Sequence, residues 1–265
     1  MGIVNVTPDS FSDGGDTPDT ARAVALGRKL IADGADILDI GGESTRPGAR
    51  PVPIDDELAR VIPVITALAD DGFTLSIDTR NGAVMAAATQ AGAKIINDVT
   101  ALEGEASLDV AAASGASVIL MHMLGEPGTM QEAPAYNDAP LDVRRYLADR
   151  IAACVNAGIE RDRIAVDPGI GFGKDLGHNL EILSRLAEFS DLGCPLVLGV
   201  SRKSFIARVS GDRGGTSAKD RLGGSLAGAL AGVARGASIL RVHDVAQTRQ
   251  AVDVWTAIGN ASPVL

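Results

Sequence analysis

The stretch RIAVDPGIGFGK, residues 163–174, reads as a short buried strand that ends on a single carboxylate. Residues 164–166 are apolar, and the Pro-Gly pair after Asp167 ends the strand. The three glycines that follow let the backbone turn tightly or approach a ligand, and Phe172 between them offers a flat apolar surface. The stretch therefore favours a site for a flat, hydrogen-bonding heterocycle. The alternative is an aspartate that caps the next helix.

The same residues do not fit the common nucleotide-binding loops. A phosphate-binding loop needs Gly, four residues and Gly-Lys-Ser/Thr, but Pro168 occupies the first Gly position and Asp175 follows Lys174. No third glycine falls where a dinucleotide-binding loop requires it.

Apolar runs of strand length recur along the chain, each followed by a turn and a segment of helical periodicity. The runs are 2–6, 36–40, 74–78, 94–98, 117–121, 163–167, 195–199 and 238–242. Helical patterns cover 17–33, 55–71, 81–91, 105–114, 141–157, 176–192, 217–235 and 245–258. Eight β/α units in sequence predict a (β/α)8 TIM barrel, with an open doubly wound sheet as the alternative. No linker divides residues 1–265, so we expect a single domain.

Composition limits the partners and the compartment. The core must be aliphatic, because hydrophobic residues make up 46% of the chain and aromatic residues 3%. A formal charge of −10 argues against nucleic acid or an anionic membrane as the main partner. Cys154 and Cys194 show no pairing or metal pattern, and Met1 starts directly in an apolar strand without a leader. We therefore expect a cytoplasmic protein with reduced thiols and no membrane span.

Polar residues follow almost every apolar run at the point where the run ends. In a barrel the carboxyl ends of all strands surround one mouth, so these residues are expected to converge on one site. They are Asn5, Asp39 with Glu43, Asp78, Asn97, His122, Asp167, Ser201 with Lys203, and Arg241 with His243. Three loops exceed what a barrel connection requires: 7–19 and 41–53, which we interpret as lids, and 122–138, which we interpret as a substrate cover or a dimer-facing segment.

Sorted by charge, these residues form two groups. Asp78, Asn97 and Asp167 are acceptors suited to the amino and ring N–H edge of a pterin or guanine-like ring, and Lys203 can donate to a ring carbonyl. Asn5, Arg241 and His243, with Arg46 on its loop, form a donor-rich group suited to a phosphate or diphosphate.

Other chemistries are less well supported. The three histidines lack zinc spacing, whereas Mg²⁺ bound through a diphosphate needs few protein ligands, and Asn5 can supply one. Ser201 and Ser204 do not form an arguable catalytic triad, because only His243 lies near them at a strand end. A Schiff base on Lys203 is chemically possible, but Arg202 beside it favours a binding role.

At this point the residues resemble those of a known family, the dihydropteroate synthases. MGIVNVTPDSFSDGG (1–15) and GGESTRPGA (41–49) match its two signature stretches. Further matches follow in the right order, namely SIDT (76–79), IND (96–98), MH (121–122), DPGIGFGK (167–174), GVSRKSF (199–205) and RVHDV (241–245). The resemblance covers essentially the whole chain.

The resemblance implies a transferase of folate synthesis that joins 6-hydroxymethyl-7,8-dihydropterin diphosphate to 4-aminobenzoate, giving 7,8-dihydropteroate and diphosphate. Carried over by motif, the pterin is held by Asp78, Asn97, Asp167, Phe172 and Lys203. Diphosphate is bound by Asn5, Arg241 and His243, with Mg²⁺ on Asn5. Phe11, Thr45, Pro47 and Ser204 border the aminobenzoate, and Asp13 and Arg46 act with Asp78 and Lys203 at the reacting centre.

The family also implies a homodimer and a target of sulfonamides, which mimic aminobenzoate. The apolar segment 225–234 is the candidate dimer face. Two departures from the family pattern stand out. No strand precedes the first motif, so the barrel floor is expected to be open or incompletely represented, and ALEGEAS (101–107) replaces a Ser-Gly-Gly-like turn. The alternative function is a folate-dependent corrinoid methyltransferase, which would share the acidic pocket and need no diphosphate group.

Overall fold

Eight parallel strands follow one another around a barrel in chain order. The computed structural model describes residues 1–7, 19–44, 49, 51–126, 128–211 and 217–261. The strands are β1 Gly2–Asn5, β2 Leu38–Gly41, β3 Leu75–Asp78, β4 Ile95–Asp98, β5 Ser117–Met121, β6 Ile164–Asp167, β7 Leu196–Leu198 and β8 Ala237–Leu240. The sheet closes because Gly2 pairs with Val242 just beyond β8, and the Ile3 amide donates to the Val242 carbonyl at 3.0 Å. The predicted barrel is confirmed, since each strand begins and ends within two residues of the expected positions.

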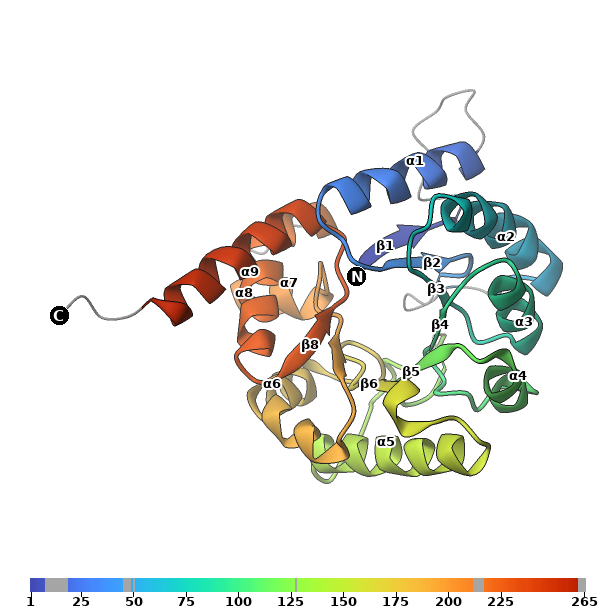
Figure 1. Cartoon of the computed structure of the whole chain (residues 1–265). Helices are drawn as coiled ribbons and strands as arrows, with labels where there is room; N and C mark the ends of the chain where they lie inside the picture. The colour runs from blue at the N-terminus through green and yellow to red at the C-terminus, as the bar shows by residue number, and fades with distance from the viewer. Residues whose placement is uncertain (8–18, 45–48, 50, 127, 212–216, 262–265) are drawn as a thin grey trace.

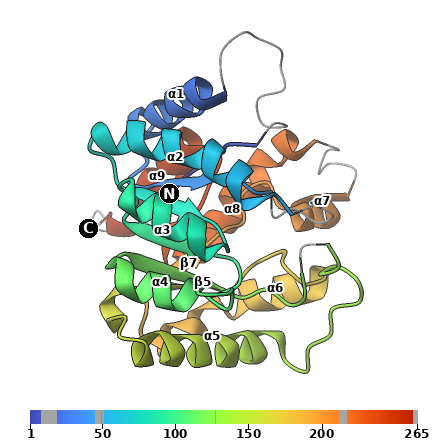
Figure 2. The same ribbon diagram turned by 90° about the vertical axis from the view of Figure 1, so that its right-hand side faces the viewer.

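Helices surround the strands on the outside (Figures 1 and 2). They are α1 Asp19–Ala32, α2 Ile54–Asp70, α3 Gly82–Gln90, α4 Ser107–Ser114, α5 Ala139–Asn156, α6 Leu176–Ser184, α7 Ser204–Ser210, α8 Leu222–Val233 and α9 Val245–Asn260. Among the described residues, 3₁₀ helices join them at η2 Arg161–Arg163, η3 Leu186–Leu192 and η5 Ala218–Arg221.

Strand side chains alternate between two separate cores. Residues facing outward, such as Val118, Leu120 and Val166, join the large core between sheet and helices. Their neighbours Ile119 and Ala165 belong to a small cluster with Met1 and Val197. This two-residue alternation is the geometry of a strand buried on both faces. Because Met1 packs into the small cluster and is only 8% exposed, the expectation of an open barrel floor is wrong.

Small residues let the helices approach the sheet closely. A Cβ added at Gly232 of α8 would lie 2.1 Å from the side chain of Leu198, and one at Gly27 of α1 would lie 2.8 Å from Leu68. Leu198 lies on β7 and Leu68 on α2, so these glycines allow α8 to pack closely on the sheet and α1 to pack closely on α2. A larger side chain at either position would force the facing leucine to move.

The helices differ from expectation after β6 and β7. The pattern 176–192 is not one α-helix but α6 followed by the 3₁₀ helix η3. Leu186, Phe189 and Leu192 are buried three residues apart, a spacing that aligns them on one line along a helix of 3.0 residues per turn. The pattern 217–235 likewise divides into η5 and α8, and helix α7 was not expected at all.

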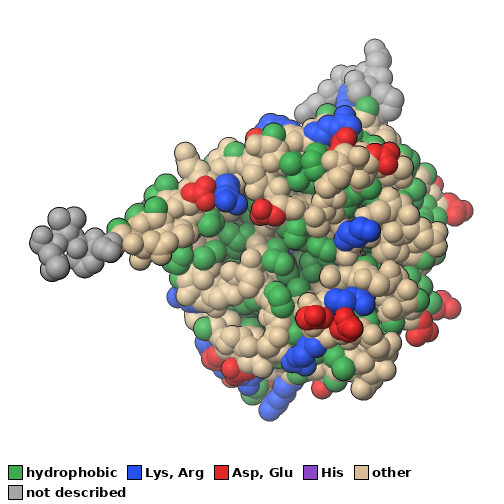
Figure 3. All heavy atoms as spheres, in the orientation of Figure 1, with side chains coloured by type: hydrophobic (Ala, Val, Ile, Leu, Met, Phe, Trp, Pro, Cys, Tyr) green, Lys and Arg blue, Asp and Glu red, His purple; other side chains and the backbone are tan. Residues whose placement is uncertain are grey.

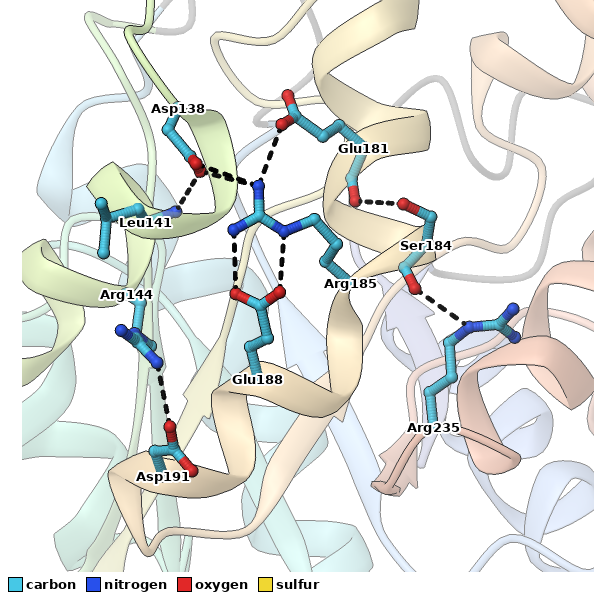
Figure 4. Close-up of polar contacts among 9 residues, drawn as sticks. All are labelled: Asp138, Leu141, Arg144, Glu181, Ser184, Arg185, Glu188, Asp191 and Arg235. Atoms are coloured by element: carbon cyan, nitrogen blue, oxygen red, sulfur yellow. Dashed lines mark hydrogen bonds and ion pairs between the residues drawn. The ribbon is translucent and has the colours of Figure 1, made fainter.

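A cluster of ion pairs holds the break between α6 and η3 (Figure 4). Arg185 donates to both carboxylate oxygens of Glu188 at 2.7 and 3.0 Å, and to both of Asp138 at 3.0 Å. Asp138 in turn accepts from the Leu141 amide at 2.9 Å and so caps α5. The cluster therefore ties the start of α5 to the end of α6.

The unusual turn after β4 is built from left-handed residues other than glycine. Ala101, Leu102 and Ala106 have φ angles of 52°, 62° and 57°. Arg150 of α5 donates to the carbonyls of Ala101 and Leu102 at 2.9 and 3.2 Å, and Asp98 accepts from the Leu102 amide at 2.9 Å. These bonds hold a backbone conformation that costs about 1 kcal/mol or more per residue.

Candidate active site

A pocket lies at the carboxyl ends of the strands. It is lined by Asp78, Asn97, Val99, Met121, Asp167, Gly169, Ile170, Phe172, Gly199, Lys203 and Arg241. The five residues predicted to hold a pterin are all among them. They come from β3, β4, β6 and the segments after β6 and β7, so the predicted convergence at the barrel mouth is confirmed.

Arg241 lies inside this pocket and joins two buried carboxylates. Its Nε donates to Asp39 Oδ2 and its Nη2 donates to Asp78 Oδ2, both at 2.6 Å. The expected separation of acidic and basic groups is therefore wrong for Arg241, because carboxylates withdrawn from water need a cation beside them. Burial raises the pKa of Asp78 to about 7, although Arg241 opposes the shift and the nearby Asp39 adds to it.

Asp167 and Lys203 form the opposite wall of the pocket. Asp167 accepts a hydrogen bond from the Gly169 amide at 2.7 Å, and burial raises the pKa of its carboxyl. The Lys203 ammonium lies 3.9 Å from the centre of the Phe172 ring, a cation–π contact. Burial lowers the pKa of Lys203 to about 8, while Asp167 acts in the other direction.

The glycine loop after β6 runs in the left-handed region at all three glycines. Gly169, Gly171 and Gly173 have φ angles of 67°, 85° and 59°. A Cβ at Gly169 would lie 1.9 Å from the His122 carbonyl oxygen, and one at Gly173 would lie 2.3 Å from the Leu124 carbonyl oxygen. Both positions therefore need glycine for conformation and for space.

Lys174 stabilises this loop through hydrogen bonds to its backbone. Its side chain is fully buried, and its Nζ donates to the carbonyls of Gly169 and Phe172 at 3.0 and 2.9 Å. It also lies 2.9 Å from His122 Nδ1. Burial lowers the pKa of Lys174 to about 7, and burial next to Lys174 lowers the pKa of His122 to about 3. His122, expected at the mouth, therefore serves as a neutral acceptor for Lys174.

Side chains of segment 122–138 also donate hydrogen bonds to the backbone of this loop. Tyr136 donates from its hydroxyl to the Gly173 carbonyl at 2.7 Å, and Gln131 Nε2 donates to the Gly171 carbonyl at 2.8 Å. From α6, Asn179 Oδ1 accepts from the Gly171 amide at 2.6 Å. The described part of this segment thus supports the pocket wall.

The remaining predicted residues lie around the pocket or outside the described residues. Asn5 ends β1 and is partly buried. His243 Nδ1 lies 3.0 Å from Ser201 Oγ, which joins the ends of β7 and β8. Ser204 is the exposed first residue of α7, next to Lys203. Phe11, Asp13, Thr45, Arg46 and Pro47 lie outside the described residues.

Two buried residues that support the pocket from behind its lining were missed as functional candidates. Asp39 was expected at the strand ends but was given no role, because its pairing with Arg241 spans 202 residues of sequence. Lys174 stood in the DPGIGFGK motif, and nothing in its position signalled full burial. A charged residue among glycines next to a strand end is the signal that was available for it.

Within residues 1–7, 19–44, 49, 51–126, 128–211 and 217–261, no group of three or more His, Cys, Asp or Glu side chains is arranged to hold a metal ion. In the same described ranges, no helix is long and apolar enough to cross a bilayer. Cys154 and Cys194 are free thiols.

Comparisons with known proteins identify the family of the chain. The family described as "Pterin binding enzyme" matches residues 1–243. The chain is 48% identical to dihydropteroate synthase of Escherichia coli K12, over 97% of this chain and 90% of that one. It is 49% identical to that of Neisseria meningitidis serogroup B, over 98% and 92%.

Solved structures show the same fold. One is Xanthomonas albilineans dihydropteroate synthase with 4-aminobenzoic acid, with a TM-score of 0.93, 48% identity and coverage of 99% of this chain and 93% of that one. Another is the Xanthomonas albilineans enzyme in complex with 7,8-dihydropteroate, with a TM-score of 0.89, 44% identity and coverage of 99% and 94%. The chain belongs to the pterin binding enzyme family and, within it, to the dihydropteroate synthases.

Proposed function

We propose that this protein joins 6-hydroxymethyl-7,8-dihydropterin diphosphate to 4-aminobenzoate, releasing 7,8-dihydropteroate and diphosphate. The observation that carries the proposal is the pocket that Asp78, Asn97, Asp167 and Lys203 line together. Three acceptors in one small cavity suit the donor edge of a pterin, and a lysine suits its ring carbonyl. The relatives described as bound to 4-aminobenzoic acid and to 7,8-dihydropteroate support the two halves of the reaction.

The chemistry needs positioning and charge stabilisation more than proton transfer. The bond between the pterin methylene carbon and the diphosphate oxygen breaks, and diphosphate leaves with the electron pair. The methylene cation is conjugated with the dihydropterin ring and lies among the carboxylates of Asp78 and Asp167. The aniline nitrogen of aminobenzoate then forms the new C–N bond and loses a proton. Because one site holds both reactants, the entropy cost of bringing them together is met by binding, before the reaction step.

Diphosphate binding and Mg²⁺ form a second part of the proposal. The amide oxygen of Asn5 at the end of β1 is a hard ligand of the kind Mg²⁺ prefers, and a diphosphate completes the coordination with few protein groups. We assign His243 to the diphosphate with Asn5, since it follows β8 next to β1. Arg241, which pairs with Asp39 and Asp78, belongs instead to the pterin pocket that it lines. When bound, Mg²⁺ neutralises charge on the leaving diphosphate.

Aminobenzoate is proposed to lie between the pocket and the loops. Ser204 at the start of α7 is the described residue on this side, and Phe11, Thr45 and Pro47 are assigned from the family motif. Asp13 and Arg46 are assigned to the reacting centre on the same basis. These five loop residues carry the proposal for sulfonamide binding as well, because sulfonamides mimic aminobenzoate.

The proposed assembly is a homodimer in the cytoplasm. Val254, Trp255 and Ile258 on α9 are 54%, 39% and 70% exposed, and Val209 on α7 is 57% exposed. The largest exposed apolar side chains near the C-terminus therefore lie on α9 rather than on the expected segment 225–234 of α8. On the face shown in Figure 3, apolar side chains lie between interspersed acidic and basic ones. The free cysteines agree with a reducing compartment.

The test is release of diphosphate by the purified protein. We expect release when the pterin diphosphate and 4-aminobenzoate are both present, together with formation of 7,8-dihydropteroate. Methyl transfer from a methylated folate to a corrinoid, with no diphosphate release, would instead establish the methyltransferase alternative. If neither reaction is observed, the proposal is overturned.

Mg²⁺ is tested separately. Treatment with EDTA is expected to abolish diphosphate release, and added Mg²⁺ is expected to restore it. An Asn5→Ala variant is expected to need a higher Mg²⁺ concentration for half-maximal rate. Full activity in EDTA would contradict the proposed metal.

A further inference from the structure

Asp39 lies one layer deeper in the barrel than the pterin pocket. In the sheet register Asp39 is the partner of Ser76, two residues before Asp78, whereas Asn97 is level with Asp78. The Asp39 side chain is fully buried and does not line the pocket. Its position is therefore beneath the residues that would contact a ring.

One oxygen of Asp39 serves two of those residues. Oδ2 accepts from Arg241 Nε at 2.6 Å and from Asn97 Nδ2 at 3.2 Å. Oδ1 is buried without a hydrogen-bond partner in the described part of the chain. Asp39 thus contacts both Asn97 and Arg241 from below.

The contact with Asn97 fixes which end of its amide faces the pocket. A carboxylate can only accept hydrogen bonds, so the NH₂ group of Asn97 must point down to Asp39. The amide oxygen is then the atom presented to a ligand. Since an amide rotated by half a turn would present a donor instead, Asp39 decides the hydrogen-bonding character of this part of the wall.

We infer that Asp39 is a specificity-determining positioning residue, which holds Asn97 so that the site accepts rings with an amino group and rejects rings with an oxygen at that edge. The inference deepens the proposed function and rests on it. Arg241, held by the same oxygen, adds a second reason for Asp39 to affect ring binding. A structural ion pair alone would change stability and leave ligand choice unaltered.

The test compares two probes on wild type and Asp39→Asn. The probes are 6-hydroxymethylpterin, with a 2-amino group, and 6-hydroxymethyl-lumazine, with a 2-oxo group. Asparagine at position 39 can donate to the Asn97 oxygen and accept from Arg241, so it favours the rotated Asn97 amide. We expect the preference for the pterin over the lumazine to fall about tenfold or more, because a mismatched polar group in a closed site is strongly rejected.

Ser76→Ala is the matched control. Ser76 is fully buried on the neighbouring strand at the level of Asp39, and among the described residues its hydroxyl has no hydrogen-bond partner. We expect this variant to keep the wild-type preference. In turnover, Asp39→Asn is expected to raise KM for the pterin diphosphate and to leave KM for 4-aminobenzoate unchanged.

A measurement on the unaltered protein keeps the inference falsifiable if Asp39→Asn does not fold. By NMR, the side-chain amide protons of Asn97 should exchange with solvent at least about tenfold more slowly than those of the exposed Asn137. Equal exchange rates, or an unchanged pterin preference in folded Asp39→Asn, would overturn the inference. Failure of wild type to bind the pterin at all would instead reject the proposed function.

Discussion

The carboxyl group of Asp78 should make ring binding depend on pH. Burial raises its pKa to about 7, so the ligand-free site holds a proton there at acidic pH, whereas pterin N–H donors require the ionised acceptor. We expect affinity for 6-hydroxymethylpterin, which carries no titrating phosphate, to increase as pH rises through about 7, measured by calorimetry. Asp78→Asn should bind more weakly and show no such rise. A rise of equal size in that variant would assign the effect to another group.

The same shift has the opposite consequence for stability. Between the ordinary pKa of 3.8 and the raised value, the folded protein holds a proton that the unfolded chain releases. The contribution of Asp78 to the free energy of unfolding therefore falls as pH rises from about 4 to 7. Binding of the pterin and stability of the free protein thus change in opposite directions over one pH range.

Gly169 should be the least replaceable glycine of the pocket. Alanine there would combine a φ of 67° with a Cβ 1.9 Å from a backbone oxygen, so we expect Gly169→Ala to cost more than about 3 kcal/mol in chemical denaturation. Gly72→Ala is the control, since φ is 82° but nothing lies within 4 Å of the added Cβ. That variant should cost only about 1 kcal/mol. If both variants lost equal free energy of unfolding, the backbone conformation at 169 alone, and not the close contact of a Cβ, would require glycine there.

Sequence reasoning found most of the residues of the pocket and missed how they are paired. Asp78, Asn97, Asp167 and Lys203 follow apolar runs, and topology brings such positions together. The pairing of Arg241 with Asp39 and Asp78 depends on side-chain reach across the barrel, which no local pattern encodes. Full burial of the Lys174 ammonium was equally hidden, because its acceptors are backbone carbonyls.

At the scale of elements, segment 122–138 is expected to control pterin binding through the glycine loop. Removing the Tyr136 hydroxyl leaves the Gly173 carbonyl without that donor, so Tyr136→Phe should lower stability by about 1 kcal/mol. It should also raise KM for the pterin diphosphate several-fold, with KM for aminobenzoate unchanged. Tyr146→Phe is the control: Tyr146 also contacts the His122 ring, but its hydroxyl bonds to Thr100 at 3.4 Å. If both variants showed similar kinetics, the Tyr136 hydroxyl would have no specific effect on pterin binding.

Strands were predicted better than helices for a physical reason. Strands buried on both faces read as continuous apolar runs between turns, and all eight were located. The 3₁₀ helix η3 was read as α-helix because Leu186, Phe189 and Leu192 also fit an amphipathic pattern roughly. Helix α7 spans only seven residues, too few for periodicity to appear.

At the scale of the molecule, the apolar end of α9 should mediate the dimer. Ile258 is 70% exposed and shares a helix face with Val254, so Ile258→Asp is expected to convert a dimer to a monomer in sedimentation velocity. Val155→Asp is the control, because Val155 is 43% exposed on α5, which Figure 1 shows apart from α9. A dimer that persists in Ile258→Asp would place the interface elsewhere.

The linkage of Asp39, Asp78 and Asn97 on β2, β3 and β4 with Arg241 just after β8 limits how the pocket can evolve. Loss of Arg241 leaves two buried carboxylates without that cation, at a cost of about 3–5 kcal/mol, which is comparable to the whole stability margin of many domains. Inhibitors that copy the pterin ring would therefore meet a target in which escape mutations need several simultaneous changes. Resistance to such compounds should arise slowly.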